Sequence, residues 1–406
     1  MINENRKVFQ NSEKILEIKI KPEITPEILK TALQKNKIVE ETATPAGLKY
    51  TRFREDFRHI ERGTIIIGKR TIPGYPHIKR IFRFGEGLLH NLHSPYFFVE
   101  EKIDGFNARI CKINGKIYAF SRGGILDSFM SEKARDPNRK FNLFFDKYPQ
   151  MVLCAEVIGN TPHTIATATA DEVTIFVFDI FDSDSGKYLD TAKKYALADK
   201  FGIITTPRLG RFKNENDGEF GSLKKLILSL NSRNGEGVVI RGEGVNGERG
   251  EILKFVTAQS DIADVAGTSS KFFDMPIGFF YQRILRSALF VHEFKLDRKR
   301  YANMLGQAFY EGLMSAFDSI ANGKDISEDF KITMNEPTVW KDIVAKTSRE
   351  VRLEKLSEEK LGGKKSDGKN SGDGKQKERT HVVFRRHYRK TSHNLRSFMG
   401  GKAVAD

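Results

Sequence analysis

Cysteine is scarce in this sequence: only Cys111 and Cys154 occur among 406 residues. Two isolated cysteines provide neither the spacing of a zinc site nor a disulfide framework. They are expected to be small core residues of a protein that works in a reducing cytoplasm. Long apolar runs are also missing, because no stretch of about eighteen apolar residues occurs, and a membrane span is not expected. The polar opening segment, MINENRKVFQNSEK, lacks the apolar core of a secretory signal.

Positive charge is what the sequence has in excess. Its 68 Lys and Arg residues outnumber 53 Asp and Glu residues, which gives a formal net charge of +15. A basic balance favours polyanionic partners such as nucleic acid, nucleotides or an anionic membrane. A surface that is merely rich in lysine gives the same total, so the charge alone identifies no site. With 39% hydrophobic residues, the chain is long enough for a sizeable core and for more than one domain.

The sequence up to Thr257 is typical of an α+β protein with large antiparallel sheets. An N-terminal module, residues 1–60, is predicted to hold a strand over 15–20 and a helix that begins after the capping Thr25. Short strands punctuated by Gly and Pro then continue through a central domain, residues 61–257. Two helices interrupt these strands: one over 190–201 that ends at Gly202, and one over 221–232.

The pattern changes after Thr257. Residues 258–360 carry apolar side chains at helical spacing, which predicts a helical domain. Its surplus of apolar residues is explained either by burial against the sheet domain or by a subunit interface. Residues 361–380, rich in Gly and Lys, predict a flexible linker. The remaining basic tail, 381–406, mixes basic and aromatic side chains, which suits phosphate contact and stacking but equally a solvated terminal helix.

The string VEEKIDGFNARI, residues 99–110, crowds charges into a predicted strand: Glu100, Glu101, Lys102 and Asp104. A lysine has an ordinary pKa of about 10.4 and becomes a nucleophile only where its neutral amine is favoured. Neighbouring acids alone favour the charged form. If Lys102 acts chemically, a metal ion or a second lysine has to offset these carboxylates.

Charged residues also occur within or beside other predicted strands, at Arg122, Glu156, Asp179, Glu236 and Lys254. A lone acid in an apolar run is costly unless it is paired or binds a metal. If these strands are neighbours, two acids near a cleft can hold Mg²⁺, and the cations can neutralise a triphosphate. Strand-end salt bridges explain each residue singly just as well. It is the ordered set that favours a site.

This order resembles the motif series of the covalent nucleotidyltransferases, the superfamily of ATP-dependent ligases and RNA capping enzymes. KIDGF at Lys102 resembles motif I, KxDG. The strings that resemble the later motifs follow in family order: SRGG from Ser121, AEVIG around Glu156, FVFDI around Phe178, EGVVI from Glu236 and LKF around Lys254. Residues 61–257 are therefore expected to be the adenylation domain. Within the superfamily, residues 99–110 look most like the archaeal-type homodimeric ATP-dependent RNA ligases.

The resemblance implies that Lys102 attacks the α-phosphorus of ATP to form lysyl-AMP, that AMP passes to an RNA 5′-phosphate, and that a 3′-hydroxyl displaces it. The implied partners are ATP, Mg²⁺ or Mn²⁺, and single-stranded RNA with a 5′-phosphate and a 3′-hydroxyl. The C-terminal helices are expected to form a homodimer. The resemblance further implies that Glu156 and Glu236 bind the metal, that Phe178 stacks on adenine and that Lys254 contacts a phosphate.

The remaining predicted contacts follow from the same resemblance. Asp104 and Arg122 match positions that contact the ribose and the incoming RNA end, and Asn107 matches an asparagine near the reacting ends. The predicted nucleotide-binding set as a whole is Glu100, Glu101, Asp104, Gly105, Asn107, Arg122, Glu156, Phe178, Glu236 and Lys254.

One departure from the family pattern affects the phosphate contacts. Motif V often has the form KxK, whereas Phe255 and Val256 follow Lys254 here. One contact is then expected from elsewhere, from Arg241 or the tail. The alternatives are a DNA ligase or a capping guanylyltransferase, which usually carry an all-β OB-fold where this sequence predicts helices. A non-catalytic RNA-binding protein on the same fold is the further alternative, but it would be expected to lack Lys102 or Glu236.

Overall fold

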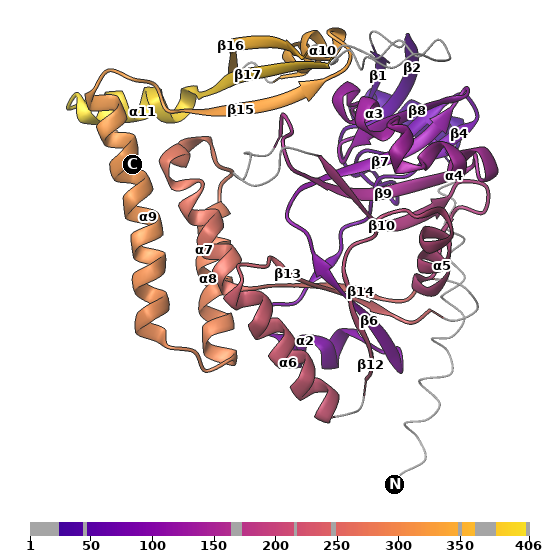
Figure 1. Ribbon diagram of the computed structural model, residues 1–406, viewed down its shortest axis with the longest axis horizontal. Helices are drawn as coiled ribbons and strands as arrows, with labels where there is room; N and C mark the ends of the chain where they lie inside the picture. Colours follow the sequence, from indigo (N-terminus) through magenta and orange to yellow (C-terminus); the bar gives the residue numbers. More distant parts are fainter. Residues whose placement is uncertain are drawn as a thin grey trace, which may run out of the picture.

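The computed structural model describes residues 24–43, 47–163, 173–214, 217–244, 249–347, 351–361 and 379–402 (Figure 1). The predicted strand at 15–20 lies outside these residues, as do residues 362–378 of the predicted linker. Within the described part of the chain, the structure is a mixture of helices and mainly antiparallel sheets, which confirms the α+β class.

The N-terminal module is a helix followed by a small sheet. Helix α1 (Pro26–Gln34) begins as predicted, because the Thr25 side chain accepts a hydrogen bond from the Ile28 amide at 3.3 Å. A four-stranded antiparallel sheet follows in the order β1-β2-β3-β4. Its strands are β1 (Ile38–Ala43), β2 (Leu48–Phe53), β3 (Ile65–Ile67) and β4 (Arg70–Ile72).

Two five-stranded sheets form the centre of the molecule. The first has the order β11-β10-β9-β7-β8 and the second β12-β6-β13-β14-β5. The strands of the first are β7 (Phe106–Ile113), β8 (Lys116–Ser121), β9 (Met151–Ile158), β10 (Thr174–Asp182) and β11 (Lys187–Tyr188). Those of the second are β5 (Lys79–Arg80), β6 (Tyr96–Lys102), β12 (Arg208–Lys213), β13 (Gly237–Gly242) and β14 (Ile252–Val256). Strands β5 and β14 run parallel, and all other neighbours are antiparallel.

A three-residue link joins the two central sheets. Strand β6 ends at Lys102 in the second sheet, and β7 begins at Phe106 in the first. The side chains of residues 100–107 are therefore divided between two sheets that meet at this link. The charged string of the sequence lies where side chains from both sheets can converge.

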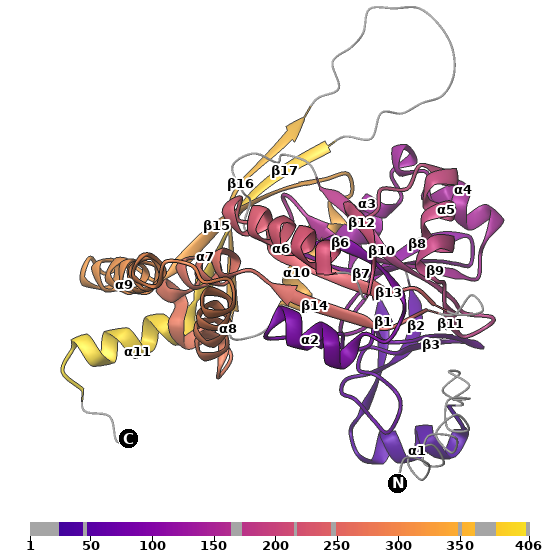
Figure 2. The same cartoon turned by 90° about the horizontal axis from the view of Figure 1, so that it is seen from below.

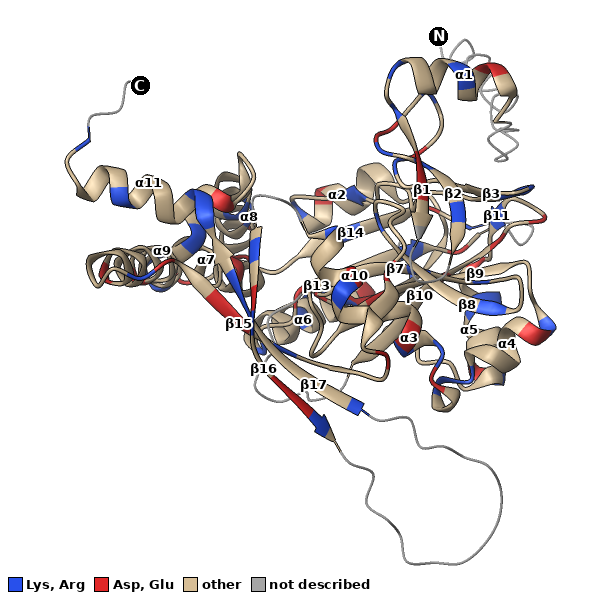
Figure 3. Cartoon of the chain, turned by 90° about the horizontal axis from the view of Figure 1, so that it is seen from above, with Lys and Arg blue, Asp and Glu red and all other residues tan. Residues whose placement is uncertain are grey.

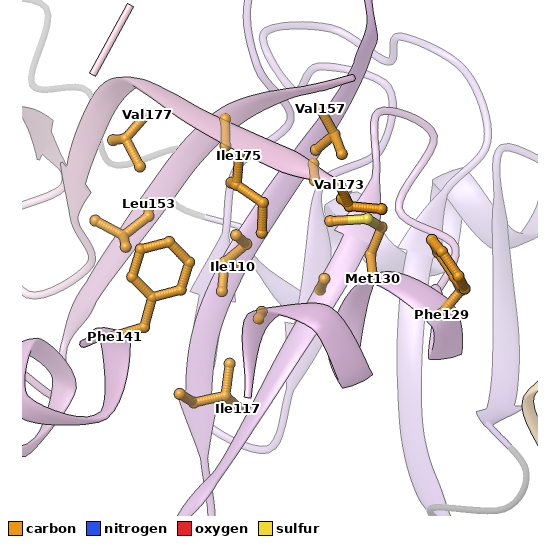
Figure 4. Packing of buried hydrophobic residues seen from close by; sticks show 14 of the residues in the cluster. Ile110, Ile117, Phe129, Met130, Phe141, Leu153, Val157, Val173, Ile175 and Val177 are labelled. Carbon is orange, nitrogen blue, oxygen red and sulfur yellow. The ribbon is translucent and has the colours of Figure 1, made fainter. Parts of the chain in front are cut away.

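Each central sheet packs its apolar face against helices. The core of the first sheet includes Ile110, Leu153 and Ile175, which meet Phe129 and Phe141 from the covering helices (Figure 4). A fully buried side chain of this size contributes roughly 1.5–3 kcal/mol. The helices beside the two sheets are α2 (Phe84–Asn91), α3 (Ser128–Ala134), the 3₁₀ turn η1 (Pro137–Arg139), α4 (Phe141–Lys147), α5 (Thr191–Phe201) and α6 (Asp217–Ser232). Helix α5 ends at Gly202 with φ of 61°, as predicted.

The region after Thr257 starts with helices, as the sequence predicts. Its elements are α7 (Ala258–Ala266), the 3₁₀ segment η2 (Ser269–Asp274), α8 (Phe279–Glu293) and α9 (Arg298–Ala321). Both views show α7, α8 and α9 gathered on one side of the molecule (Figures 1 and 2). Helix α8 reaches the core of the second sheet, where the rings of Phe290 and Phe255 stack with centroids 5.7 Å apart. No helix of the described chain is long and apolar enough to cross a membrane.

The last part of the chain differs from the prediction of an all-helical domain with a separate tail. Strands β15 (Ser327–Met334), β16 (Val351–Leu361) and β17 (Arg379–Tyr388) form an antiparallel sheet in the order β15-β17-β16. Helix α10 (Thr338–Lys346) lies between β15 and β16 in the sequence, and α11 (Arg389–Met399) follows β17.

Residues 379–388 form the middle strand of this sheet because their apolar side chains alternate. Val382 and Phe384 are buried, and Phe384 stacks on Phe330 of β15 with centroids 5.3 Å apart. Basic residues in between are paired with acids of the neighbouring strands: Arg385 with Asp329 at 2.7 Å, and His387 with Glu354 at 2.8 Å. Lys/Arg and Asp/Glu positions accordingly lie next to one another along β15 and β16 (Figure 3). Residues 381–402 thus belong to a packed sheet and helix.

Candidate active site

Lys102 lies at the junction of the two central sheets, beside a carboxylate. Its Nζ donates a hydrogen bond to the Glu236 carboxylate at 2.6 Å, and the two side chains are 20% and 15% exposed. Glu236 immediately precedes β13, in which Gly237 is the register partner of Lys102. The sequence motifs that contain these two residues are therefore brought together by the antiparallel pairing of β6 and β13.

The glycine of the KIDG string has a packing role. A Cβ at Gly105 would collide with the carbonyl oxygen of Val157 on β9. Glycine lets the β6–β7 link lie directly against β9, which brings Glu156 on that strand into register with Asn107. Gly105 therefore positions the residues around it as well as lining the site.

A cavity of about 300 Å³ opens at this junction. Most of the predicted site residues line it: Glu100, Glu101, Lys102, Gly105, Asn107, Arg122, Glu156, Phe178 and Lys254. Asp104 and Glu236 are not among the lining residues. Asp104 raises the pKa of both Glu156 and Glu236, and Glu156 also raises the pKa of Glu236. The strings recognised in the sequence are thus gathered around one cavity.

Phe178 reaches the cavity from a local irregularity of β10. The register between β9 and β10 shifts between Val177 and Asp179, so an extra residue is inserted at Phe178. Such a bulge turns a side chain away from the regular alternation of the strand. The Phe178 ring contacts Tyr75 edge to face with centroids 5.0 Å apart, which fixes an aromatic pair in the cavity wall.

Glu100, a predicted nucleotide-binding residue, is fully engaged with the protein. Its side chain is 1% exposed and accepts hydrogen bonds from Lys194, from Tyr195 at 2.7 Å and from Arg241 at 2.6 Å. Burial alone opposes ionisation, but Arg241 and Lys194 outweigh it and lower the pKa of Glu100. The carboxylate therefore stays charged in the cavity wall, where it pairs with Lys194 of α5 and Arg241 of β13.

Arg241 belongs to the same buried network and is not available as the missing phosphate contact. Its Nε donates to Glu100, its Nη1 to Asp179 at 3.3 Å and its Nη2 to the Phe178 carbonyl at 2.7 Å. Asp179 also accepts hydrogen bonds from Tyr75 and Arg249. Residues 381–388 of the predicted tail are packed in β17, so neither they nor Arg241 is free to supply the second phosphate contact.

The carboxylates nearest Lys102 are in the opposite electrostatic situation. Burial is the main cause that raises the pKa of Glu156 and of Glu236, each to about 7. Burial and the nearby Asp264 also raise the pKa of Asp104. One lysine does not neutralise these three carboxyl groups. An added cation would, and this shortage of positive charge is what a metal site requires.

The donor set fits a hard divalent cation that is completed by other ligands. Glu156 and Glu236 offer carboxylate oxygens, and within the described residues no group of three or more His, Cys, Asp or Glu side chains could hold a metal ion. Mg²⁺ is commonly held by one or two carboxylates with phosphate oxygens and water. The residues present suit a metal that arrives with a nucleotide.

The cations of the site gather along β14 and β8. Lys254 pairs in register with Val239 of β13, and burial, Arg80 and Lys102 together lower its pKa to about 8. Arg122, at the end of β8, is exposed and contacts His77 at 3.3 Å. Asn107 adds a buried Oδ1 without a hydrogen-bond partner among the described residues. These groups present polar atoms and positive charge to the cavity.

The sequence prediction missed Lys194, Arg233 and Arg80. Lys194 shares the buried face of α5 with Thr191, Tyr195 and Ala198, so a lysine on the apolar face of a predicted helix was the available signal. Arg233 donates to Glu101 at 2.7 Å at the rim. Arg80 lies in a two-residue strand next to Lys254, which no sequence pattern indicates.

Family comparisons agree with this geometry. Residues 95–256 match the RNA ligase family model, and residues 268–365 match the model of the Pab1020 ligase C-terminal region. The uncharacterized protein MJ0414 of Methanocaldococcus jannaschii is 27% identical over 298 residues, which span 70% of this chain and 73% of the relative.

Two solved structures resemble almost the whole chain. A candidate ATP-dependent DNA ligase from Aquifex aeolicus is 28% identical with a TM-score of 0.83, over 94% of this chain and all of the other. An archaeal ATP-dependent RNA ligase is 23% identical with a TM-score of 0.79, over 93% of this chain and 96% of the other, and shows the shared fold.

The fold, the lysine beside a buried carboxylate and the ordered strings define a covalent nucleotidyltransferase. Residues 95–256 form an RNA ligase domain, and residues 268–365 match the C-terminal region of the Pab1020 ligase.

Proposed function

We propose that this protein is an ATP-dependent RNA ligase that joins a 5′-phosphate to a 3′-hydroxyl through a lysyl-AMP intermediate on Lys102. The observation that carries the proposal is the position of Lys102, whose Nζ is 2.6 Å from Glu236 in a cavity that also contains an aromatic ring and cations. This cavity lies within the segment that matches the RNA ligase model.

The first step uses the residues of the β6–β13 junction. The neutral Lys102 amine attacks the α-phosphorus of ATP, a P–N bond forms, and pyrophosphate leaves with the electron pair of the broken P–O bond. Phe178, at the bulge in β10, is placed to stack on the base, and Lys254 to contact a phosphate. Positioning and charge neutralisation dominate the catalysis of such transfers.

Glu156 and Glu236 are the residues that would hold a divalent metal, Mg²⁺ or Mn²⁺. The bound ion would neutralise phosphate charge and lower the cost of ionising these carboxyl groups. In the later steps, Asn107 and Arg122 are at the cavity wall, where they can contact the RNA ends.

We also propose that the protein is a homodimer through α8 and α9. Large apolar side chains on and just before these helices are exposed to solvent, among them Ile277, Tyr281, Ile284, Tyr310 and Met314. Exposed apolar groups that cluster on neighbouring helices are typical of subunit interfaces. Sedimentation measurements at several protein concentrations test this state.

Labelling with ATP tests the enzymatic proposal. The protein is incubated with α-labelled ATP or GTP and a divalent metal, and denaturing electrophoresis then shows whether label stays on the chain. ATP label on the wild type, absent from Lys102→Arg, is expected. Label from GTP alone would identify a capping enzyme instead, and no label from either nucleotide would identify a non-catalytic RNA-binding protein.

A DNA ligase is the second candidate, since the relative from Aquifex aeolicus is described as one and is 28% identical. Matched 5′-phosphorylated single strands of RNA and DNA, and a nicked DNA duplex, separate the two. Sealing of RNA in preference to both DNA substrates is the expected result. Efficient sealing of the nicked duplex with unreacted RNA would contradict the proposal.

A further inference from the structure

Arg80 is a half-buried cation for which the described residues provide no counterion. Its side chain makes no hydrogen bond or ion pair within the described chain, and its Nε is buried without a partner. Three other cations near the site are engaged: Lys102 with Glu236, Arg241 with Glu100, and Arg249 with Asp179. A buried polar group without a partner is costly, so an unpaired arginine beside an active site calls for a ligand.

A second unpaired cation lies directly beside it. Arg80 is the register partner of Lys254 in the parallel pair β5–β14, and within the described residues Lys254 also has no ion pair. Their mutual repulsion contributes to the lowered pKa of Lys254. Two adjacent, partly buried cations without an acid between them form a site for an anion with several negative oxygens.

The surrounding acids are already committed, so they do not fill this site. Asp261 binds Arg286, and Asp264 binds Arg283 at 2.7 Å, which leaves neither carboxylate for Arg80. Glu236, the other acid that acts on Arg80, is hydrogen-bonded to Lys102. The anion for Arg80 must therefore come from outside the described chain.

The positions of the two cations indicate which part of the substrate Arg80 meets. Lys254 lines the cavity that also contains Phe178 and Lys102, and Arg80 is its register partner on β5. Arg80 itself lies outside the residues that line this cavity. A nucleotide with its base at Phe178 and its α-phosphorus at Lys102 would extend its distal phosphates past Lys254 toward Arg80.

We propose that Arg80, together with Lys254, binds the β- and γ-phosphates of ATP and holds the pyrophosphate as it leaves. The inference rests on the proposed function, because it requires Lys102 to react with a triphosphate. When the P–N bond to Lys102 forms, the bond between the α-phosphorus and the bridging oxygen breaks, and that oxygen leaves on pyrophosphate with the electron pair. The two surplus protons of the lysine ammonium pass to solvent. Arg80 neutralises charge that develops on the departing group.

Three reactions distinguish this role from a structural one. The first is labelling of Lys102 by ATP, the second is release of that label by inorganic pyrophosphate, and the third is sealing of a strand that already carries AMP on its 5′-phosphate. Pyrophosphate takes part only in the first two. The variants are Arg80→Ala, Arg80→Lys and, as matched control, Lys79→Ala, an exposed neighbour on the same strand.

Arg80→Ala is expected to slow labelling and pyrophosphate-driven release about 10- to 100-fold, while sealing of the adenylylated strand stays within about twofold. Arg80→Lys should recover part of the loss, and Lys79→Ala should match the wild type in all reactions. Equal losses in all three reactions, or a loss confined to sealing of the adenylylated strand, would overturn the assignment, as would unchanged labelling. Absence of label on the wild type would instead overturn the proposed function itself.

Discussion

Two groups of buried charge lie a few residues apart on the same strand, and they are built in opposite ways. Around Glu100, each oxygen has a cationic partner, and the pKa of the carboxyl is lowered. Around Lys102, the carboxyls of Glu156 and Glu236 exceed the available cations, and their pKa values are raised to about 7. The first group is complete within the protein. The second is left incomplete, as expected where a metal and a polyphosphate are to bind.

The comparison shows why the glutamates around this cavity have different tasks. A buried charge whose partner is removed costs several kcal/mol, because the remaining ion cannot be solvated. A carboxyl that already has a raised pKa can take up a proton instead. The two groups should therefore respond differently to matched substitutions.

Removing the lysine of each group should give the largest contrast. Lys194→Met leaves the buried Glu100 short of a cation and is expected to lower the free energy of unfolding by about 3–5 kcal/mol. Lys102→Met leaves Glu236 able to protonate, so we expect a loss of only about 1 kcal/mol, with complete loss of ATP labelling. Urea unfolding of both variants measures the difference. Equal destabilisation would contradict the distinction between the groups.

A pH series should reveal the free-energy cost of ionising the buried carboxyl group of Glu156. Burial raises its pKa from 4.5 to about 7, so its favourable contribution to stability is complete below pH 4.5 and is lost as pH rises through 7. This loss corresponds to roughly 3 kcal/mol. Glu156→Gln should therefore gain stability over the wild type between pH 5 and pH 8, in chelator and without nucleotide. A constant difference between the two proteins across this range would refute the interpretation.

The hydroxyl of Tyr195 provides a smaller test of the complete group. It donates to Glu100 at 2.7 Å, and a hydrogen bond to a charged group contributes about 1.5–3 kcal/mol. Tyr195→Phe should lower the free energy of unfolding by that amount without a change in ATP labelling per folded molecule. A labelling defect in the folded variant would show that the Glu100 network also takes part in the reaction.

The smallest effect is expected at the rim. Arg233, 55% exposed on its side chain, pairs with Glu101 at 2.7 Å. An exposed ion pair contributes about 0–1 kcal/mol. Arg233→Ala should therefore change stability by less than about 1 kcal/mol, and the change should shrink further in 0.5 M salt. A loss as large as that of Lys194→Met would mean that Glu101 belongs to the buried network.

The sequence was sufficient to predict which strings converge, because they follow the order of a known motif series and occupy strands. It could not show that Glu100 is paired with buried cations of the protein, since adjacent strand residues look alike until their partners are known. Lys194 was detectable as a lysine on the apolar face of a helix. Arg80 was not, because its importance depends on a parallel pairing between residues far apart in sequence.

The C-terminal error has a different cause. The alternation of buried residues at Thr380, Val382 and Phe384 is a strand signal, but the absence of acids in that segment favoured a free basic tail. The acids that neutralise it, Asp329 and Glu354, are on other strands. Local charge therefore gave no information about the charge of the assembled sheet.

The close approach of Gly105 to β9 adds a constraint that is independent of the reaction. Any larger side chain at 105 would push the β6–β7 link off Val157 and separate the amine at 102 from the carboxylate at 156. Invariance of such a glycine in related enzymes would then report a spacing between two sheets, whatever nucleotide or nucleic acid each enzyme uses. Within one short catalytic motif, one residue can therefore be required for the spacing of two sheets and a nearby residue for the reaction.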